Sequence, residues 1–444
     1  MDAFFTKYQV FIATLITVFA YLILGYFFER EQFYWLLFLY SLAFIGTIAL
    51  LQTQEYEKTF FKIGTAYRLI FLFSTPALSQ DFYRFIWDGH TILSGINPYQ
   101  YKPEIIINTI ADFPNAKYLF DKMGSLSASH FSNYPPINQL FFFIAALIGG
   151  KSILVSTMVL RLFIILADIG IYYYGRKILT HFNKNTEVIF WYFLNPLVIL
   201  ELTGNLHFEG VMLFFFVAGL YFLIQNKWII TAVFIALSIS AKLLPLLLLP
   251  LFLKYFGFKK CVLFYTLIIG LNLLFFLPFL NVTLANNYLE TISLWFTNFE
   301  FNASIYYVVR EIGYYVKGYN IIHTIGKITP IITIVIILLF AFLKKNKSVE
   351  EIAVNALMII TLYLFISTTV HPWYVLNLVL LSVFTKYKFP IVWSFVIILT
   401  YYAYSVFPFK ENMILIIAEY GIVFSVFLFE ILFQPLRLKN NGKC

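Results

Sequence analysis

Charged residues are scarce in this sequence. Asp, Glu, Lys and Arg make up 12% of the 444 residues, and 61% are apolar, whereas an ordinary globular chain carries about 25% charged residues. A water-soluble protein of this length needs more charges than that to cover its surface. Cysteine is almost missing as well. With Cys261 and Cys444 as the two cysteines, a disulfide framework and a cysteine-based metal site are both excluded.

What the sequence has instead is long apolar runs. A helix needs about 20 apolar residues to cross the hydrocarbon core of a bilayer. We therefore predict an all-α polytopic membrane protein with about twelve transmembrane helices. The expected spans are 8–28, 33–52, 61–78, 152–174, 187–203, 209–225, 261–280, 328–343, 352–370, 372–385, 389–407 and 413–433. Three shorter apolar stretches are interpreted as re-entrant half-helices, which require burial of their ends, at 137–149, 228–241 and 243–253.

The positive charges predict the orientation. If the half-helices do not cross, most of the 31 basic residues fall on the side of the two termini, as in cytoplasmic loops. The net charge of +9 then needs no nucleic-acid partner. We expect one integral membrane domain (1–444) in the cell membrane, with both termini cytoplasmic. Two long segments, 79–137 and 281–327, are expected on the outer side, and they offer room for an active site.

The first outer segment begins with charged residues at helical spacing. Asp81, Arg84 and Asp88 share one face of a helix, while Phe82 and Ile86 lie on the other. This pattern predicts an amphipathic helix in the membrane interface, with its carboxylates at the water boundary. A solvated face with an ion pair is the alternative interpretation.

Other polar residues lie at outer ends of spans. Tyr134 precedes two prolines that begin the 137–149 stretch, where plain helix capping is the alternative. A tight turn holds Asn205, His207 and Glu209, which are candidate substrate ligands, although short outer turns are polar in any case.

Two more candidates are a lysine and a histidine. Lys242 lies between two half-helices, where an ammonium is costly unless paired. It is a candidate partner for a lipid phosphate, and snorkelling to the interface is the alternative. His371 begins a His-Pro-Trp-Tyr sequence at the outer end of a span, where an aromatic belt is the alternative. The sequence has no Walker loop and no zinc-binding His-Glu-x-x-His helix.

Together these positions resemble the GT-C class of integral-membrane glycosyltransferases. The resemblance covers residues 75–255 and 371–374, and the similar branch contains bacterial polyprenol-phosphate-mannose-dependent mannosyltransferases and the catalytic subunit of GPI mannosyltransferase I. It rests on these blocks: Asp81-Phe-Tyr-Arg-Phe-Ile-Trp-Asp-Gly, Gly95-Ile-Asn-Pro-Tyr, Tyr134-Pro-Pro, Asn195-Pro with Gly204-Asn, Ala241-Lys-Leu-Leu-Pro and His371-Pro-Trp-Tyr.

The resemblance implies a reaction and a division of labour. A hexose, with mannose as the first expectation, would move with inversion from a polyprenyl-phosphate sugar to a lipid-linked or glycan acceptor, on the extracytoplasmic face. Asp81 matches the family's general base, and Arg84 is expected to keep it ionised. Lys242 and His371 would stabilise the leaving phosphate. The remaining substrate-binding candidates are Arg84, Asp88, Tyr134, Asn205, His207 and Glu209.

Two points stay open in this interpretation. Some relatives carry Asp-x-Asp in the first outer segment, whereas Phe82 and Tyr83 follow Asp81 here. We therefore expect no cofactor, and leave dependence on a divalent metal undecided. The alternative function is a polytopic transporter or a flippase for lipid-linked glycans, because broken helices and intramembrane charges also occur in such proteins.

Overall fold

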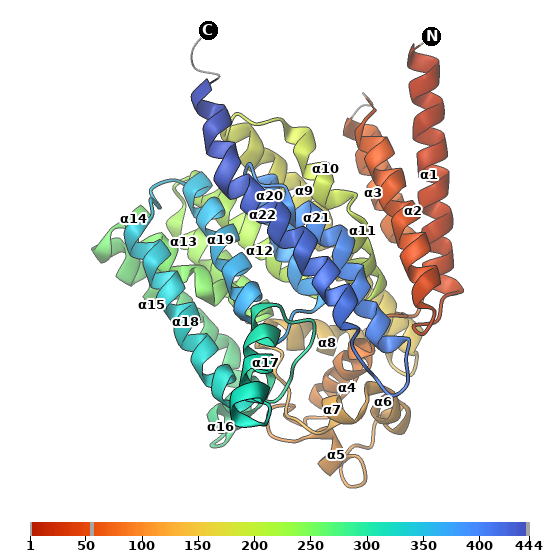
Figure 1. Cartoon of the computed structure of the whole chain (residues 1–444). Coiled ribbons are helices and arrows are strands. Elements are labelled where there is room, and N and C mark those ends of the chain that lie inside the picture. Colours follow the sequence, from red (N-terminus) through yellow and green to blue (C-terminus); the bar gives the residue numbers. More distant parts are fainter. Residues whose placement is uncertain (1, 54–56, 441–444) are drawn as a thin grey trace.

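The computed structural model describes residues 2–53 and 57–440, so Lys443 and Cys444, expected at the cytoplasmic end, lie outside it. The described chain is helical (Figure 1), and it contains one isolated backbone bridge, between Phe301 and Thr369. The prediction of an all-α membrane protein is confirmed. Its organisation as one domain stays a prediction.

In the part of the chain that the structure describes, seven helices are long and apolar enough to cross a bilayer. They are α1 (Asp2–Tyr26), α2 (Phe33–Leu51), α9 (Ile153–His181), α15 (Phe258–Phe276), α18 (Ile322–Leu343), α19 (Val349–Ile366) and α22 (Met413–Asn440). Two of these begin at serine caps: Ser152 accepts from the Val155 N–H and Ser348 accepts from the Glu351 N–H, which satisfies N–H groups that the first turn leaves free.

Several expected spans are shorter helices. At about 1.5 Å per residue, a helix of 17 residues or fewer does not cross a 30 Å core by itself. The count of twelve spans is therefore not confirmed. The shorter apolar segments are α8 (Pro136–Gly149), α12 (Glu209–Ile224), α13 (Trp228–Ala241), η3 (Leu244–Leu251) with α14 (Phe252–Phe256), η5 (Pro372–Tyr374) with α20 (Val375–Val383), and α21 (Phe389–Val396) with η6 (Ile397–Tyr404).

The expected span 61–78 is wrong. Helix α3 (Glu57–Ile70) ends eight residues earlier, and irregular backbone follows as far as Gln80. Side chains of other elements satisfy this backbone: Arg161 donates to the Leu72 carbonyl, and Asn205 accepts from the Leu78 N–H. Irregular backbone at membrane depth is tolerated where protein buries it.

The expected span 187–203 is bent by 49°. It consists of η1 (Thr186–Ile189) and α10 (Phe190–Phe193), then α11 (Pro196–Val198) and the π-helix η2 (Ile199–Gly204). Pro196 has no N–H to continue the first part, and Asn195 caps the second by accepting from the Leu197 N–H; a proline at this point breaks a helix.

Both described ends of the chain lie at one end of the helix bundle (Figure 1). The short helices α5 (Pro103–Ile106), α6 (Ala116–Met123) and α7 (Ser125–Ala128) lie at the opposite end, with α16 (Leu284–Thr297) and α17 (Ile305–Lys317) from the second long segment. Lys102 and Glu290 join the two long segments by an ion pair of 3.0 Å.

An ion pair supports the half-helix interpretation of 137–149. Arg176, near the end of α9, pairs with Glu57 at the start of α3, so α9 ends on the side of the chain termini. Both ends of α8 lie at the opposite side, because the first long segment donates hydrogen bonds to the Lys151 carbonyl after α8 and to the Tyr134 carbonyl before it. Helix α8 therefore does not cross the bundle.

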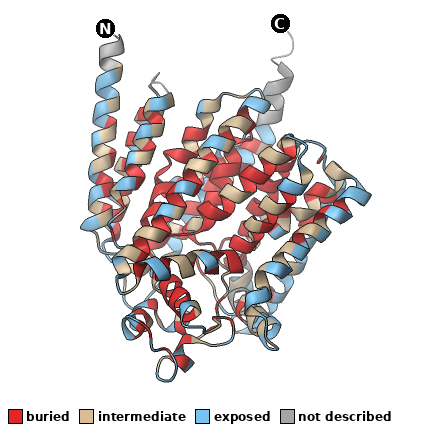
Figure 2. Cartoon of the chain, turned by 180° about the vertical axis from the view of Figure 1, so that it is seen from behind, coloured by how far each residue is buried: buried red, intermediate tan, exposed pale blue. Residues whose placement is uncertain are grey.

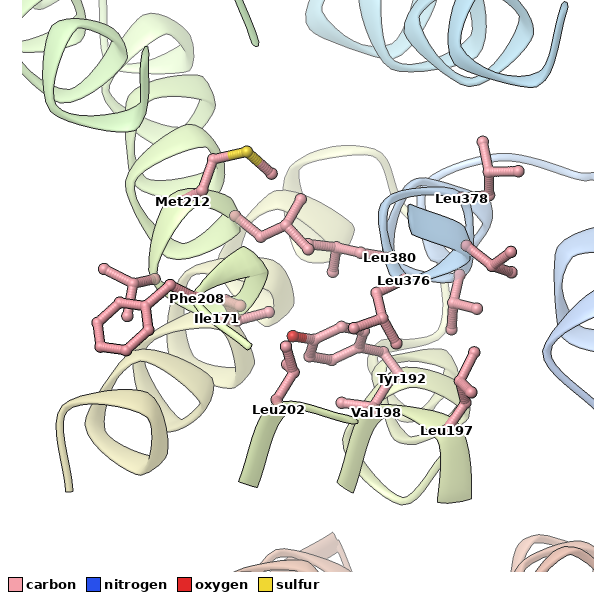
Figure 3. Close-up of a cluster of buried hydrophobic side chains, with 14 of the residues drawn as sticks. Ile171, Tyr192, Leu197, Val198, Leu202, Phe208, Met212, Leu376, Leu378 and Leu380 are labelled. Carbon is pink, nitrogen blue, oxygen red and sulfur yellow. The ribbon is translucent and has the colours of Figure 1, made fainter. Parts of the chain in front are cut away.

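The buried core lies between the bent span and the helices beside it. Ile171 of α9, Tyr192 of α10, Leu202 of η2, Met212 of α12 and Leu376 of α20 gather there (Figure 3). Seen from behind, buried residues fill the interior while exposed ones lie along the outer helices (Figure 2). Many of those exposed residues are large and apolar, as in Leu273 of α15 and Ile331 of α18, which suits contact with lipid.

Candidate active site

Helix α4 (Asp81–Leu93) carries the first candidate residues, and it is buried. It packs mainly against α8 and α6, with Arg84 and Asp88 at 1% and 0% exposure. The prediction of a polar face in water is therefore wrong. Helical periodicity identified which residues share a face, but the segment 125–139, from α7 to the start of α8, covers that face.

Asp88 forms the centre of a buried polar network. Its carboxylate accepts from Arg84 Nε at 2.7 Å, from Ser132 Oγ at 2.6 Å and from Gln139 Nε2 at 3.1 Å. Arg84 also donates to the carbonyls of Ser127 and His130. Arg84 is thus bound to Asp88 and the loop rather than to Asp81, which corrects the expectation that it keeps Asp81 ionised. The pair fastens α4 to the segment that leads into α8.

Asp81 differs from its neighbours because its side chain is 37% exposed. It is the first residue of α4, and its N–H donates to Ser79 Oγ at 3.2 Å. Withdrawal from water raises the pKa of Asp81, while the charges of Lys242 and Arg30 oppose that rise. A carboxylate of this kind is accessible and has an increased affinity for a proton.

The turn between η2 and α12 brings a histidine beside Asp81. His207 Nε2 lies 3.9 Å from Asp81 Oδ2, and the side chain of His207 is 2% exposed. Its Nδ1 is 3.2 Å from Glu201 Oε2. Asn205, in the same turn, holds Glu201 and the Leu78 N–H, so it fixes the local backbone from a buried position.

Glu209 and Lys242 form an ion pair next to this turn. The Glu209 side chain is 2% exposed and that of Lys242 is 23% exposed. Lys242 ends α13 in an extended conformation, which lets its side chain reach Glu209. Within the described chain Glu209 Oε2 has no hydrogen-bond partner. The pair therefore presents an accessible ammonium and one unsatisfied carboxylate oxygen.

His371 joins the site from a distant part of the chain. Its ring stacks on Trp373 with centroids 4.3 Å apart, and the His207 ring lies 3.8 Å from the same Trp373 ring. Burial lowers the pKa of His371 to about 3, with Lys242 and Arg30 acting in the same direction. His371 is consequently neutral at pH 7, so it offers a hydrogen bond to a phosphate but no charge.

Arg30 and Tyr134 complete the surroundings of Asp81. The Arg30 guanidinium, in the turn between α1 and α2, lies 3.5 Å from the centre of the Tyr404 ring. Burial raises the pKa of Tyr134 well above its usual value, and the charge of Asp81 adds to the rise, so the Tyr134 phenol is close enough to feel that carboxylate. Two cations, Arg30 of the α1–α2 turn and Lys242 at the end of α13, therefore act on the charge of Asp81.

The structure thus brings together six of the predicted residues and separates two. One site is surrounded by Asp81, Tyr134, His207, Glu209, Lys242 and His371. Asn205 supports this site, while Arg84 and Asp88 form the buried network behind it. Sequence analysis missed Arg30 and Glu201. An ionisable residue inside an expected span indicates function, and that signal was available for Glu201.

Acidic, histidine and cysteine side chains do not gather at a metal site here. In residues 2–53 and 57–440, no three of them are placed to hold one ion. The expectation of no cofactor stays a prediction, and dependence on a divalent metal stays open.

Comparison with known proteins places this arrangement in a family. The profile described as "Alpha-(1->6)-mannopyranosyltransferase, N-terminal domain" matches residues 8–256, more than half of the chain. The chain belongs to this family. The match includes Arg30, Asp81, Glu201, His207 and Lys242, whereas His371 lies beyond it.

Two curated relatives carry the same description. Alpha-(1->6)-mannopyranosyltransferase A of Mycobacterium tuberculosis is 26% identical over 172 residues, covering 38% of this chain and 32% of that protein. The protein of that name from Corynebacterium glutamicum is 21% identical over 188 residues, covering 40% and 35%. The alignments therefore span about a third of each relative.

Proposed function

We propose that this protein is a mannosyltransferase that takes mannose from a polyprenyl-phosphate donor and adds it to a glycan or glycolipid acceptor. Membership of the mannopyranosyltransferase family supports the sugar and the reaction class. The observation that carries the proposal is Asp81, an accessible carboxylate on whose charge the cations Lys242 and Arg30 act.

Asp81 acts as the general base. It takes the proton of the acceptor hydroxyl while the hydroxyl oxygen attacks the anomeric carbon, a contribution worth about 10²–10⁴-fold in rate. A single displacement from the face opposite the phosphate inverts the anomeric configuration. The raised proton affinity of Asp81 favours this role near neutral pH.

Lys242 and Arg30 hold the donor phosphate. Charge on the leaving oxygen grows as the glycosidic bond breaks, and fixed cations in a partly dry site stabilise it strongly. Neutral His371 donates a hydrogen bond to the same group. Glu209, with its unsatisfied oxygen beside Lys242, accepts from a sugar hydroxyl.

The reaction takes place on the extracytoplasmic face. Helix α4, which begins at Asp81, lies at the bundle end with the two long segments, opposite the chain termini (Figure 1), and the basic loops favour cytoplasmic termini. A donor carried on a lipid suits this position, because a nucleotide sugar would remain in the cytoplasm.

The test uses purified protein in lipid nanodiscs with radiolabelled polyprenyl-phosphate mannose and the lipid extract of the source cells. We expect a labelled mannolipid or mannoglycan with wild type and none with Asp81→Asn, with or without EDTA. No product with wild type, together with movement of a fluorescent lipid-linked glycan across vesicles, would instead establish a flippase. Loss of product with EDTA, restored by a divalent cation, would show that a metal is required.

A further inference from the structure

Glu201 is a buried carboxylate that accepts hydrogen bonds from several directions. Tyr401 Oη lies 2.6 Å from Oε1, while Asn205 Nδ2 and His207 Nδ1 lie 3.3 Å and 3.2 Å from Oε2. The orientation of the Asn205 amide is determined, because its oxygen already accepts from the Leu78 N–H. Its NH₂ group therefore faces Glu201 as a donor.

These contacts determine the tautomer of His207. Both Glu201 oxygens accept hydrogen bonds here, Oε1 from Tyr401 and Oε2 from the Asn205 amide, so the Nδ1 that faces Oε2 acts as a donor and carries the proton. Burial lowers the pKa of His207 well below its usual value, with Lys242 and His371 contributing in that direction. A neutral ring with its proton on Nδ1 leaves Nε2 unprotonated, as a hydrogen-bond acceptor.

The unprotonated nitrogen points toward the proposed base. Nε2 lies 3.3 Å from Ser79 Oγ and 3.9 Å from Asp81 Oδ2. Ser79 Oγ in turn accepts from the Asp81 N–H at 3.2 Å, so its own hydroxyl proton is free for His207. Each group in this series therefore donates to the next one: the Asp81 N–H to Ser79, the Ser79 hydroxyl to His207 Nε2, and His207 Nδ1–H to Glu201.

The backbone at this place is unusual in two ways. Glu201 sits in the π-helix η2, and Leu206 has a φ of +63°. Single π-turns occur frequently at functional sites, and a bulky residue in the left-handed region is a strained outlier. Strain of this kind persists when the surrounding structure enforces it. Here it orients His207 between the two carboxylates.

From this geometry we propose that Glu201 and His207 form a positioning pair, in which Glu201 holds the His207 proton on Nδ1 so that the Nε2 acceptor faces Asp81 and favours uptake of the reaction proton by that carboxylate. The inference rests on the proposed function. The acceptor oxygen bonds to the anomeric carbon as the carbon–oxygen bond to the phosphate breaks, and that electron pair stays on the phosphate. The hydroxyl proton goes to Asp81 and stays on its carboxyl group, beside the His207 Nε2 acceptor. The proton passes to water when the products leave, which restores the Asp81 carboxylate.

The first test measures the tautomer and needs no turnover. The chain has six histidines, so ¹⁵N-histidine labelling with His207→Gln as the assignment control resolves its two nitrogens by NMR. We expect a protonated Nδ1 and an unprotonated Nε2 in wild type. A protonated Nε2 would overturn the proposal. Absence of mannosyl transfer would overturn the proposed function, yet the tautomer would still be decided.

The second test measures rates against pH. The groups that face His207 are Glu201, Asp81, Lys242 and His371. In Glu201→Gln the amide donates to Nδ1, so the ring proton moves to Nε2 and stabilises ionised Asp81. We expect the acidic limb of kcat/KM to move to lower pH and kcat to fall at least about 10-fold, with the donor KM unchanged.

In His207→Gln we expect a similar loss of kcat, but the acidic limb of kcat/KM should not move as it does in Glu201→Gln. The double variant should have a kcat no lower than that of either single variant, because the two residues act as a unit. The matched control is His90→Gln, a buried histidine on α4 that stacks on Phe113 and should keep wild-type kcat. Normal kcat and an unchanged acidic limb in folded His207→Gln and Glu201→Gln would overturn the proposal.

Discussion

Asp81 and Asp88 lie two turns apart on one helix, but their surroundings differ. Asp88 is buried and accepts three hydrogen bonds, whereas Asp81 is 37% exposed and faces His207 at 3.9 Å. A carboxylate whose acceptor sites are occupied cannot receive a proton from a substrate. The two residues should therefore respond differently to the same substitution.

We predict that Asp81→Asn lowers kcat at least about 10²-fold, because the amide keeps the shape and loses the proton affinity. Its thermal unfolding and donor binding should remain near those of wild type. Asp88→Asn should instead leave Arg84 buried without its partner, at a cost of about 3–5 kcal/mol, and lower the folded yield. Near-normal turnover in folded Asp81→Asn would place the base elsewhere.

Substitution of Lys242 should affect two measurable properties, donor use and folded yield. If it binds the donor phosphate, Lys242→Met should weaken donor use by about 1.5–3 kcal/mol, the value of one charge-assisted contact. Because the change also leaves Glu209 buried and unpaired, the folded yield should fall.

The double variant Lys242→Met with Glu209→Gln separates these effects. It removes both charges, so the yield should recover while donor use, measured as kcat/KM, stays low. Recovery of donor kcat/KM together with the yield would show that Lys242 only neutralises Glu209.

The sequence predicted much of the site at this scale. Turns and span ends are polar where substrates bind, and this signal identified Asp81, His207, Lys242 and His371, which the structure brings together. It misassigned Arg84, because spacing along a helix does not reveal which distant loop covers it. Arg30 was missed because its partner Tyr404 is more than 300 residues away in the chain.

At the element scale, the position of α4 depends on a close approach to α8. A Cβ added to Gly89 would lie 2.1 Å from the Phe142 carbonyl oxygen, a backbone atom that cannot move without its helix. Only glycine allows the two helices this contact. Since Asp81 is on α4, the contact also sets the position of the proposed base.

Gly89→Ala should therefore separate α4 from α8, although alanine is the better helix former by about 1 kcal/mol. We expect a lower thermal unfolding midpoint, from overpacking of about 1–3 kcal/mol, and reduced kcat. Gly270→Ala in α15 is the matched control, because nothing lies within 4 Å of its Cβ position. An unchanged midpoint and kcat in Gly89→Ala would show that α4 is held by other contacts.

Element boundaries were predicted well where hydropathy alone decides them. The half-helices 137–149 and 228–241 begin and end within one residue of α8 and α13. The span 61–78 failed because Arg161 and Asn205 satisfy the irregular backbone after Ile70. Such long-range side-chain contacts leave no periodic pattern in the sequence.

At the scale of the whole molecule, polar contacts connect the loops that the distribution of positive charges predicted to lie on the side of the chain termini. Lys184 pairs with Glu350 and donates to the Phe384 carbonyl, and Lys254 donates to the Phe342 and Lys344 carbonyls. The long segments meet at the other end through Lys102 and Glu290. The sequence thus predicted which loops share an end, although it gave a count of spans that the helix lengths do not confirm.

The last prediction concerns which end faces outward. In a background with Cys261→Ala and Cys444→Ala, single cysteines replace the exposed Asn298 and Lys345, and Lys177 near the end of α9. If the proposed orientation holds, an impermeant maleimide added to intact cells should label Asn298→Cys, because the second long segment lies outside. Lys345→Cys and Lys177→Cys should react only after permeabilisation, since both lie at the end of the chain termini. Labelling of Lys345→Cys in intact cells would reverse the orientation and place Asp81 on the cytoplasmic face. Labelling of Lys177→Cys alongside Asn298→Cys would instead show that α8 crosses the membrane.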